Sequence, residues 1–249
     1  MNHFDIKPGE GALFAHAHGD DEAMATAAAA DSAAASGAAM YGVTAVDGSA
    51  GRNPDGNSNL AQERSLETTV AWEHLGVRPE RQFLLGLPDR GVHSNLHVPR
   101  IAAALAAILE QHDITALFAP DEGGFDGHRH HSDVGRAVLL AAQNFNGVVW
   151  LLNSQGSGDV VVPVNPYRKL QVLRLHATQF PGIQAAPEGQ EPPPGYELLY
   201  GHFVLRSTAK LIQPYEHLLH EETYDAWQPP RRQRTLIAMG SGALALPGQ

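Results

Sequence analysis

Residues 11–22 read Gly-Ala-Leu-Phe-Ala-His-Ala-His-Gly-Asp-Asp-Glu, an apolar run followed by a cluster of histidines and acids. The short apolar run predicts a buried strand at 11–15. The Ala-rich segment that follows, from about 22 to 35, predicts a helix. The same order of strand and then helix recurs along the chain: we expect strands at 41–46, 82–85, 114–119 and 148–152, and helices at 60–75, 98–110 and 132–143.

This alternation of strands and helices is typical of βαβ units. It predicts an α/β protein with a Rossmann-like, mostly parallel sheet and helices on both faces. Beyond Asn153 the pattern is less regular: Pro163 indicates an edge strand at 160–164, because proline cannot donate to a sheet, and we expect a helix at 166–176 and a strand at 196–205. No repeat or linker divides the chain. We therefore predict one domain over 1–249, with its core at about 11–180 and a less regular part at 181–249.

The amino-acid composition limits the kinds of partner, catalytic group and metal site that the protein can have. The 249 residues include 17 basic and 27 acidic side chains, a formal net charge of −10, which argues against a nucleic-acid or anionic-membrane partner. The sequence has no cysteine, so disulfides, thiolate catalysis and Cys-ligated metal sites are excluded. It has 14 histidines, and any metal must therefore be held by imidazole and carboxylate groups.

Targeting signals are not visible in the sequence. No stretch approaches the roughly 20 apolar residues that span a bilayer, and residues 1–10 contain acids but no apolar segment of the secretory type. We predict a cytoplasmic protein without stable membrane association. Assembly into a homo-oligomer stays open.

The first group of chemically active residues is 16–22, His-Ala-His-Gly-Asp-Asp-Glu, at the carboxyl end of the first predicted strand. Ligands of open parallel sheets bind at that edge. His18 and Asp21 lie three positions apart across a strand-to-helix turn, so their side chains can converge on one ion. Asp20 would then lie beside the metal without binding it, placed to transfer protons. A structural alternative is that these aspartates cap the following helix.

The second group is 120–133, a Gly- and His-rich loop after the predicted strand at 114–119. His128 and His131 lie three positions apart and face the same side of an opening helical turn. Taken alone, this could be a solvated loop that binds metal adventitiously. Together with His18 and Asp21 at the same sheet edge, it supplies two histidines and one carboxylate with an open position, as in a catalytic zinc site.

These motifs resemble those of the PIG-L/LmbE-like family of zinc-dependent N-deacetylases, which read His-Pro-Asp-Asp-Glu and His-x-x-His. Here the first reads His18-Gly19-Asp20-Asp21-Glu22, with glycine in place of proline, and the second reads 128–131, with His130 where the family often has aspartate. The resemblance runs from about residue 12 to 180. It includes the segments Gln62-Glu63-Arg64 with Glu67, Leu75-Gly76, Leu87-Pro88-Asp89, Lys169 and His176-Ala177-Thr178-Gln179.

The resemblance implies a role for each matching residue. His18, Asp21 and His131 match the ligands of zinc (Zn²⁺), Asp20 matches the general base, and His128 matches the histidine that steadies the oxyanion or donates a proton. Substrate hydroxyls would be held by two further residues, Arg64 and Asp89, although Arg64 could instead pair with Glu63 or Glu67 on a helix surface. The resemblance implies no role for His16 or His130. The roles of His176 and Gln179 stay open.

The implied activity is zinc-dependent hydrolysis of the N-acyl amide of an amino sugar. The partner would be a small N-acyl amino sugar or glycoside, and the sequence does not choose its aglycone or acyl length. An alternative is a carbohydrate- or nucleotide-binding module that contains a structural metal and lacks hydrolytic activity. A Rossmann-type oxidoreductase is disfavoured, because no Gly-x-Gly-x-x-Gly follows the first strand.

Overall fold

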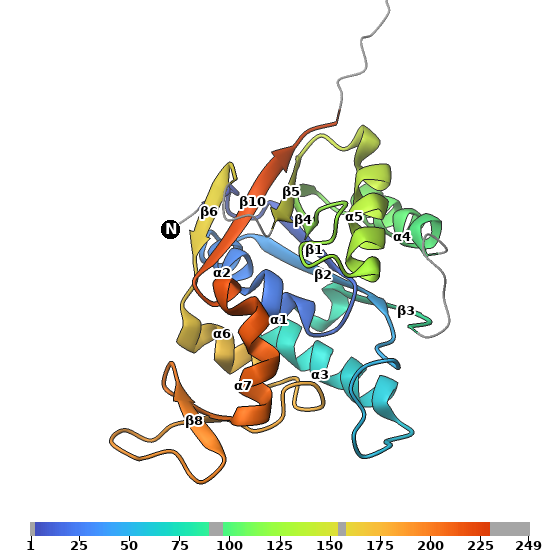
Figure 1. The fold of residues 1–249 in the computed structure, drawn as a ribbon. Coiled ribbons are helices and arrows are strands. Elements are labelled where there is room, and N and C mark those ends of the chain that lie inside the picture. Colours follow the sequence, from blue (N-terminus) through green and yellow to red (C-terminus); the bar gives the residue numbers. More distant parts are fainter. Residues whose placement is uncertain (1–2, 90–96, 154–157, 230–249) are drawn as a thin grey trace, which may run out of the picture.

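A computed structural model describes residues 3–89, 97–153 and 158–229. Its centre is a seven-stranded sheet in the order β3-β2-β1-β4-β5-β10-β6 (Figure 1). The first five of these strands run parallel, as the alternating pattern predicts. They are β1 (Gly11–His16), β2 (Ala39–Val46), β3 (Gln82–Leu87), β4 (Ile114–Pro120) and β5 (Val148–Asn153).

Strand β1 is buried along its whole length, because the sheet is covered on both faces. Ala12 and Phe14 point into one apolar core, whereas Leu13 and Ala15 point into the other. The first core packs under α1 (Asp21–Ala25), α2 (Ala27–Ala35), α3 (Leu60–His74), α6 (Pro166–Leu173) and α7 (Arg206–Ile212). The second packs under α4 (Val98–Gln111) and α5 (Arg129–Ala141), at the upper right of Figure 1.

The C-terminal part completes the sheet and adds a small one. Strand β10 (Glu221–Trp227) inserts antiparallel between β5 and β6 (Val160–Pro163), so β6 is the edge strand that Pro163 indicates. The second sheet has the order β7-β9-β8, formed by β7 (Ile183–Ala185), β8 (Tyr196–Leu199) and β9 (His202–Leu205). Short 3₁₀ turns lie at η1 (Pro79–Arg81), η2 (Ala142–Asn144) and η3 (Gln213–Leu219).

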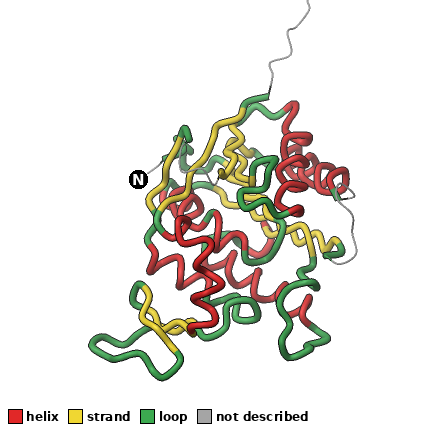
Figure 2. Tube along the Cα trace, in the orientation of Figure 1, coloured by secondary structure: helices red, strands yellow, loops and turns green. Residues whose placement is uncertain are grey.

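Among the predicted elements that differ in the structure, three bear on the topology or the site. The helix expected at 22–35 is two helices, because Thr26 leaves helical geometry (φ −134°) and its Oγ1 lies 2.9 Å from His16 Nε2. The strand expected at 196–205 is a hairpin, since Tyr200 and Gly201 turn with positive φ. The helix expected from 132 begins at Arg129, which places His131 in its first turn. Figure 2 shows the small hairpin apart from the main sheet.

The strand order creates a crevice at one sheet edge. From β1 the chain moves outward to β2 and β3 on one side, and β4 and β5 continue on the other side. Between β1 and β4 the connections therefore diverge, which is where open α/β sheets bind ligands. Both chemically active loops follow these two strands. Among the described residues, no helix is long and apolar enough to cross a membrane.

Candidate active site

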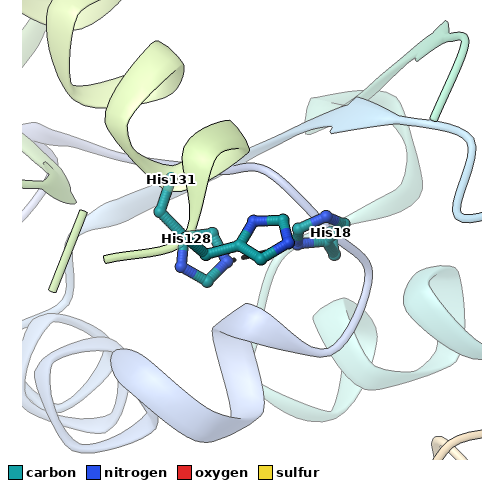
Figure 3. A group of neighbouring side chains, drawn as sticks. All are labelled: His18, His128 and His131. Atoms are coloured by element: carbon teal, nitrogen blue, oxygen red, sulfur yellow. Dashed lines mark hydrogen bonds between the residues drawn. The ribbon is translucent and has the colours of Figure 1, made fainter. Parts of the chain in front are cut away.

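Side chains from two loops converge in the crevice beyond β1 and β4. His18 follows β1, Asp21 opens α1, and His131 comes from the first turn of α5. The atoms His18 Nδ1 and His131 Nε2 are 3.2 Å apart. Asp21 places Oδ1 3.1 Å from His131 Nε2 and Oδ2 3.5 Å from His18 Nδ1. Figure 3 shows His128 and His131, at the start of α5, directed toward His18.

These separations fit a tetrahedral zinc ion. Zinc binds nitrogen and oxygen at about 2.0–2.1 Å, so two ligand atoms of a tetrahedron lie about 3.3–3.4 Å apart. The separations of 3.1, 3.2 and 3.5 Å surround that value. A second combination also fits, because ligand atoms of His18, His128 and His131 lie within 4.8 Å of one another. The donor set is thus suitable for zinc, with either Asp21 or His128 beside the two shared histidines.

Asp21 is fixed by the loop before it. Its Oδ2 accepts hydrogen bonds from the backbone N–H groups of Ala17 (3.0 Å) and His18 (2.8 Å). These donors precede helix α1, so the carboxylate does not cap the helix as the structural alternative supposed. Burial by itself raises the pKa of Asp21, but His131 and His18 hold it well below its usual range. The carboxylate is therefore ionised and presents its charge to the cluster.

His131 is oriented by a residue to which the sequence analysis gave no role. Its Nδ1–H donates to Asp126 Oδ1 at 2.7 Å, which leaves Nε2 facing His18 and Asp21. Its ring also stacks on Phe125, with centroids 4.7 Å apart. Burial lowers the pKa of His131, but Asp21 and Asp126 outweigh it and raise the pKa to about 10. The same negative field favours a bound cation, and a carboxylate behind a metal-binding imidazole is a common support.

Asp20 lies beside this cluster and is held by Arg64. Arg64 Nη2 donates to Asp20 Oδ1 at 3.0 Å, and its Nη1 donates to Gly48 O at 3.0 Å. Although Asp20 occupies the N-cap position of α1, its side chain makes no capping hydrogen bond. Arg64 is buried, so it does not form the surface pairs with Glu63 or Glu67 that were considered from the sequence. It instead fixes the direction of the Asp20 carboxylate.

His128 closes the cluster on its exposed side. Its ring centroid lies 4.9 Å from those of His18 and His131. Nδ1 accepts the backbone N–H of His130 at 3.3 Å, so the ring proton of a neutral His128 is on Nε2. Loss of hydration, together with the neighbouring imidazoles of His18 and His131, lowers the pKa of His128 to about 4. His128 is thus a neutral imidazole with an N–H to donate.

Asp89 and His130 lie on the other side of the His18 ring. His130 Nδ1 is 3.2 Å from His18 Nε2 and 3.4 Å from Asp89 Oδ1. Asp89 Oδ2 accepts the backbone N–H of Ala50 at 3.1 Å. Burial raises the pKa of Asp89, but hydrogen bonding to His130 and the charge of His18 lower it to about 2. Asp89 therefore reaches the predicted site, and so does His130, which had no assigned role.

Other residues of the family-like segments support the site from behind. His176 Nε2 lies 2.6 Å from Glu22 Oε1, and both groups are buried. Burial raises the pKa of Glu22 to about 7, against the opposing effect of His176. Lys169 Nζ pairs with Glu222 at 3.0 Å and so joins α6 to β10. Gln179 Oε1 accepts the backbone N–H of Arg52 and fixes that loop. Each of these contacts joins segments that are distant in the sequence.

The cluster opens into a cleft of about 200 Å³. His18, Asp20, His128 and His131 contribute its polar side, together with Arg64 and Asp126. Apolar side chains line the rest: Met24 from α1, Phe125, Phe180 and Tyr215. Tyr215 O–H donates to Asp126 Oδ2 at 3.3 Å. An amide placed here would meet the cluster on one side and an apolar wall on the other.

Comparison with known proteins identifies the family. Residues 13–142, more than half of the chain, match the PIG-L family, described as GlcNAc-PI de-N-acetylase. The chain belongs to this family. The family is one of deacetylases, which are amide hydrolases, so the chain is an enzyme of that class and the predicted resemblance is confirmed. Among curated proteins, none matches the sequence significantly.

Solved structures share the fold. N,N'-diacetylchitobiose deacetylase from Pyrococcus horikoshii is 18% identical with a TM-score of 0.66, over 88% of this chain and 84% of that one. The zinc inhibited form of teicoplanin deacetylase Orf2 is 17% identical with a TM-score of 0.55, over 86% and 96%. The 4-carboxy-2-hydroxymuconate hydratase GalB from Pseudomonas putida KT2440 is 14% identical with a TM-score of 0.56, over 89% and 97%. At these identities the likeness shows the fold alone.

The glycine that replaces the proline of the PIG-L motif has a steric reason. A Cβ added at Gly19 would lie 1.9 Å from Thr68 Oγ1 on α3. Thr68 is fixed there, because its hydroxyl donates to Arg64 O at 2.7 Å. Proline carries the same Cβ as alanine and would meet the same atom. The close approach of the loop to α3 therefore requires glycine while threonine occupies position 68.

We expect Gly19→Ala to lower the free energy of unfolding by about 1–3 kcal/mol, the usual cost of overpacking. In a Thr68→Ala background the same change should cost much less, because the opposing hydroxyl is gone. Urea unfolding of the four proteins of this double-mutant cycle measures the coupling. Gly123→Ala is the matched control, since its new Cβ would meet only Asp121 at an ordinary 3.4 Å. Equal losses in both backgrounds would show that Thr68 is not the cause.

Proposed function

We propose that this protein is a zinc-dependent N-deacetylase that hydrolyses the N-acetyl amide of a soluble amino-sugar glycoside. One observation carries the proposal: Asp20 lies beside the ligand cluster without belonging to it, and Arg64 directs it at 3.0 Å. A metal with a purely structural role does not need a free carboxylate at its side. An amide hydrolase does, because water must lose a proton as it attacks.

Zinc held by His18, Asp21 and His131 would supply Lewis-acid polarisation of the amide carbonyl and a water whose pKa falls to about 7. Asp20 takes the proton of the attacking water at its carboxylate. The protonated Asp20 then gives that proton to the nitrogen of the leaving amine, so that the products are a free amine and acetate. Arg64 keeps the carboxylate aimed throughout, because its two Nη atoms bind Asp20 Oδ1 and Gly48 O.

His128 donates a hydrogen bond to the oxyanion. Because its Nδ1 accepts a backbone N–H, its Nε2–H is free to donate to the negative oxygen that forms when the carbonyl is attacked. The lowered pKa of about 4 keeps the ring neutral at pH 7, so it acts as a hydrogen-bond donor without carrying a charge of its own. The contact strengthens as charge develops, which is the condition for an effect on kcat.

Recognition of the sugar is assigned to Asp89 and Arg64. A carboxylate can accept hydrogen bonds from adjacent hydroxyls, and Asp89 Oδ1 faces the His18 side of the cluster. Arg64 borders the same cleft, although both of its Nη atoms already have partners. The apolar wall of Met24, Phe125 and Phe180 suits the acetyl methyl group or an apolar aglycone. The net charge of −10 favours a neutral or cationic glycoside.

The test is amine release from a panel of N-acetylglucosaminides. Purified protein reconstituted with zinc is incubated with each compound, and free amine and acetate are measured together. We expect the two products in equal amounts, and none after chelation. Saturable binding of a glycoside without release of amine would instead support a binding module with a structural metal.

A further inference from the structure

A second group of ligand atoms adjoins the proposed zinc centre and shares one residue with it. His18 Nε2, His130 Nδ1 and Asp89 Oδ1 lie within 4.8 Å of one another. Their separations are 3.2 Å for the two nitrogens, 3.4 Å from His130 to Asp89, and 4.0 Å from His18 to Asp89. The spacing is slightly wider than in the first cluster. His130 and Asp89 are buried, and His18 is nearly so.

Once an ion occupies His18 Nδ1, protons alone cannot satisfy these three atoms. When His18 binds an ion through Nδ1, its Nε2 carries the ring proton, which points to His130 Nδ1 at 3.2 Å but lies too far from Asp89 at 4.0 Å. His130 Nδ1 must then accept, and its lone pair faces the Asp89 carboxylate across 3.4 Å. If His130 Nδ1 carries a proton instead, two N–H groups oppose each other.

The other residues that the structure describes do not relieve this conflict. Among the described residues, His130 Nε2 has no hydrogen-bond partner, so every polar contact of the ring is made through Nδ1. Within the described part of the chain, the partners of Asp89 Oδ1 are His18 and His130, and the backbone N–H of Ala50 binds Oδ2. A buried acceptor without a donor is costly. A cation bound by the three atoms would satisfy all of them at once.

We propose that His18 Nε2, His130 Nδ1 and Asp89 Oδ1 form a second divalent-cation site next to the first, with the imidazole of His18 bridging the two ions. Two nitrogens and one carboxylate oxygen suit zinc and related transition metals better than calcium or magnesium. Binding of the second ion displaces the proton of His18 Nε2 to solvent. Because of that step, the second site is the weaker of the two and fills only after the first.

Zinc titration of the metal-free protein, followed by calorimetry and elemental analysis after gel filtration, tests the proposal. We expect about two zinc ions per wild-type chain, the second bound more weakly, and about one in His130→Asn. The asparagine amide can donate to Asp89 and accept from His18, so it relieves the conflict without an ion. Asp89→Asn provides an independent variant with the same expected loss. His217→Asn, which removes an exposed histidine elsewhere, should still bind both ions.

Two results would overturn the second site. One is a wild-type chain that binds a single zinc at saturation. The other is a second zinc that persists in both His130→Asn and Asp89→Asn, since it would then be held at another surface position. Neither result bears on deacetylation, because the stoichiometry is read without substrate.

A consequence for turnover rests on the proposed function. The second ion would bind Asp89, so zinc beyond the first equivalent should slow amine release by the wild type. In His130→Asn the rate of amine release should be the same with one equivalent of zinc and with excess zinc. If the second ion binds and turnover is unaltered, the second site stands and the assignment of Asp89 to sugar binding is wrong.

Discussion

Replacement of His131 by alanine is expected to remove zinc from the protein. His18→Ala and Asp21→Ala should have the same effect, with affinity reduced by well over the roughly 100-fold that loss of a supporting residue costs. The reason is geometric: the three side chains provide ligand atoms 3.1–3.5 Å apart, and no two of them complete the set. Elemental analysis and competition with a zinc-binding dye measure the loss.

The comparison of Asp21→Ala with His128→Ala decides the third ligand. If Asp21 binds the metal, His128→Ala keeps zinc and loses kcat. If zinc persists in Asp21→Ala and is lost in His128→Ala, the set is the three imidazoles within 4.8 Å of one another. Retention of zinc in all three ligand variants would contradict a metal centre here. His217→Asn serves again as the control for loss of a histidine.

Zinc binding should also release a proton. In the metal-free protein the carboxylates of Asp21 and Asp126 raise the pKa of His131 to about 10, so His131 is protonated at neutral pH. The ligand form is unprotonated. Zinc affinity should therefore rise as pH increases toward that pKa.

The position of the site followed from local sequence. Each of the two apolar runs at 11–15 and 114–119 ends in a group of histidines and acids, and parallel strands bring such ends to one edge. That was enough to place His18, Asp21 and His131 together. Asp126 belongs to the second group as well, but its contact with His131 depends on the path of the loop, where Gly124 and Gly127 turn with positive φ.

Other features depend on contacts between distant segments. Strand β10 contains Glu222, whose charged side chain is fully buried in the fold. Its charge is satisfied by Lys169 and by the backbone N–H groups of Ala28 and Ala29. These two alanines belong to α2 and precede Glu222 by more than 190 residues. Arg64 is similar, because only the tertiary fold turns it inward to Asp20. No local pattern of polar and apolar residues in the sequence predicts either arrangement.

Asp20→Asn should leave zinc in place and lower kcat by about 10²–10⁴, the range that general acid–base catalysis contributes. Asparagine has the same shape, and its amide oxygen can still accept from Arg64 Nη2, so the loop keeps its geometry. What it cannot do is take the proton of the attacking water. Metal content and single-turnover release of amine, measured on the same preparation, separate the two effects.

The matched control is Glu63→Gln, which removes an exposed carboxylate from α3 next to Arg64 without touching the cleft. Its kcat and zinc content should equal those of the wild type. Loss of zinc in Asp20→Asn would mean that Asp20 is a ligand and that Asp21, held by the backbone N–H groups of Ala17 and His18, is structural. Full activity and full zinc content in Asp20→Asn would mean that another group takes the proton of the attacking water. The lowered pKa of about 4 makes His128 a poor base for that step.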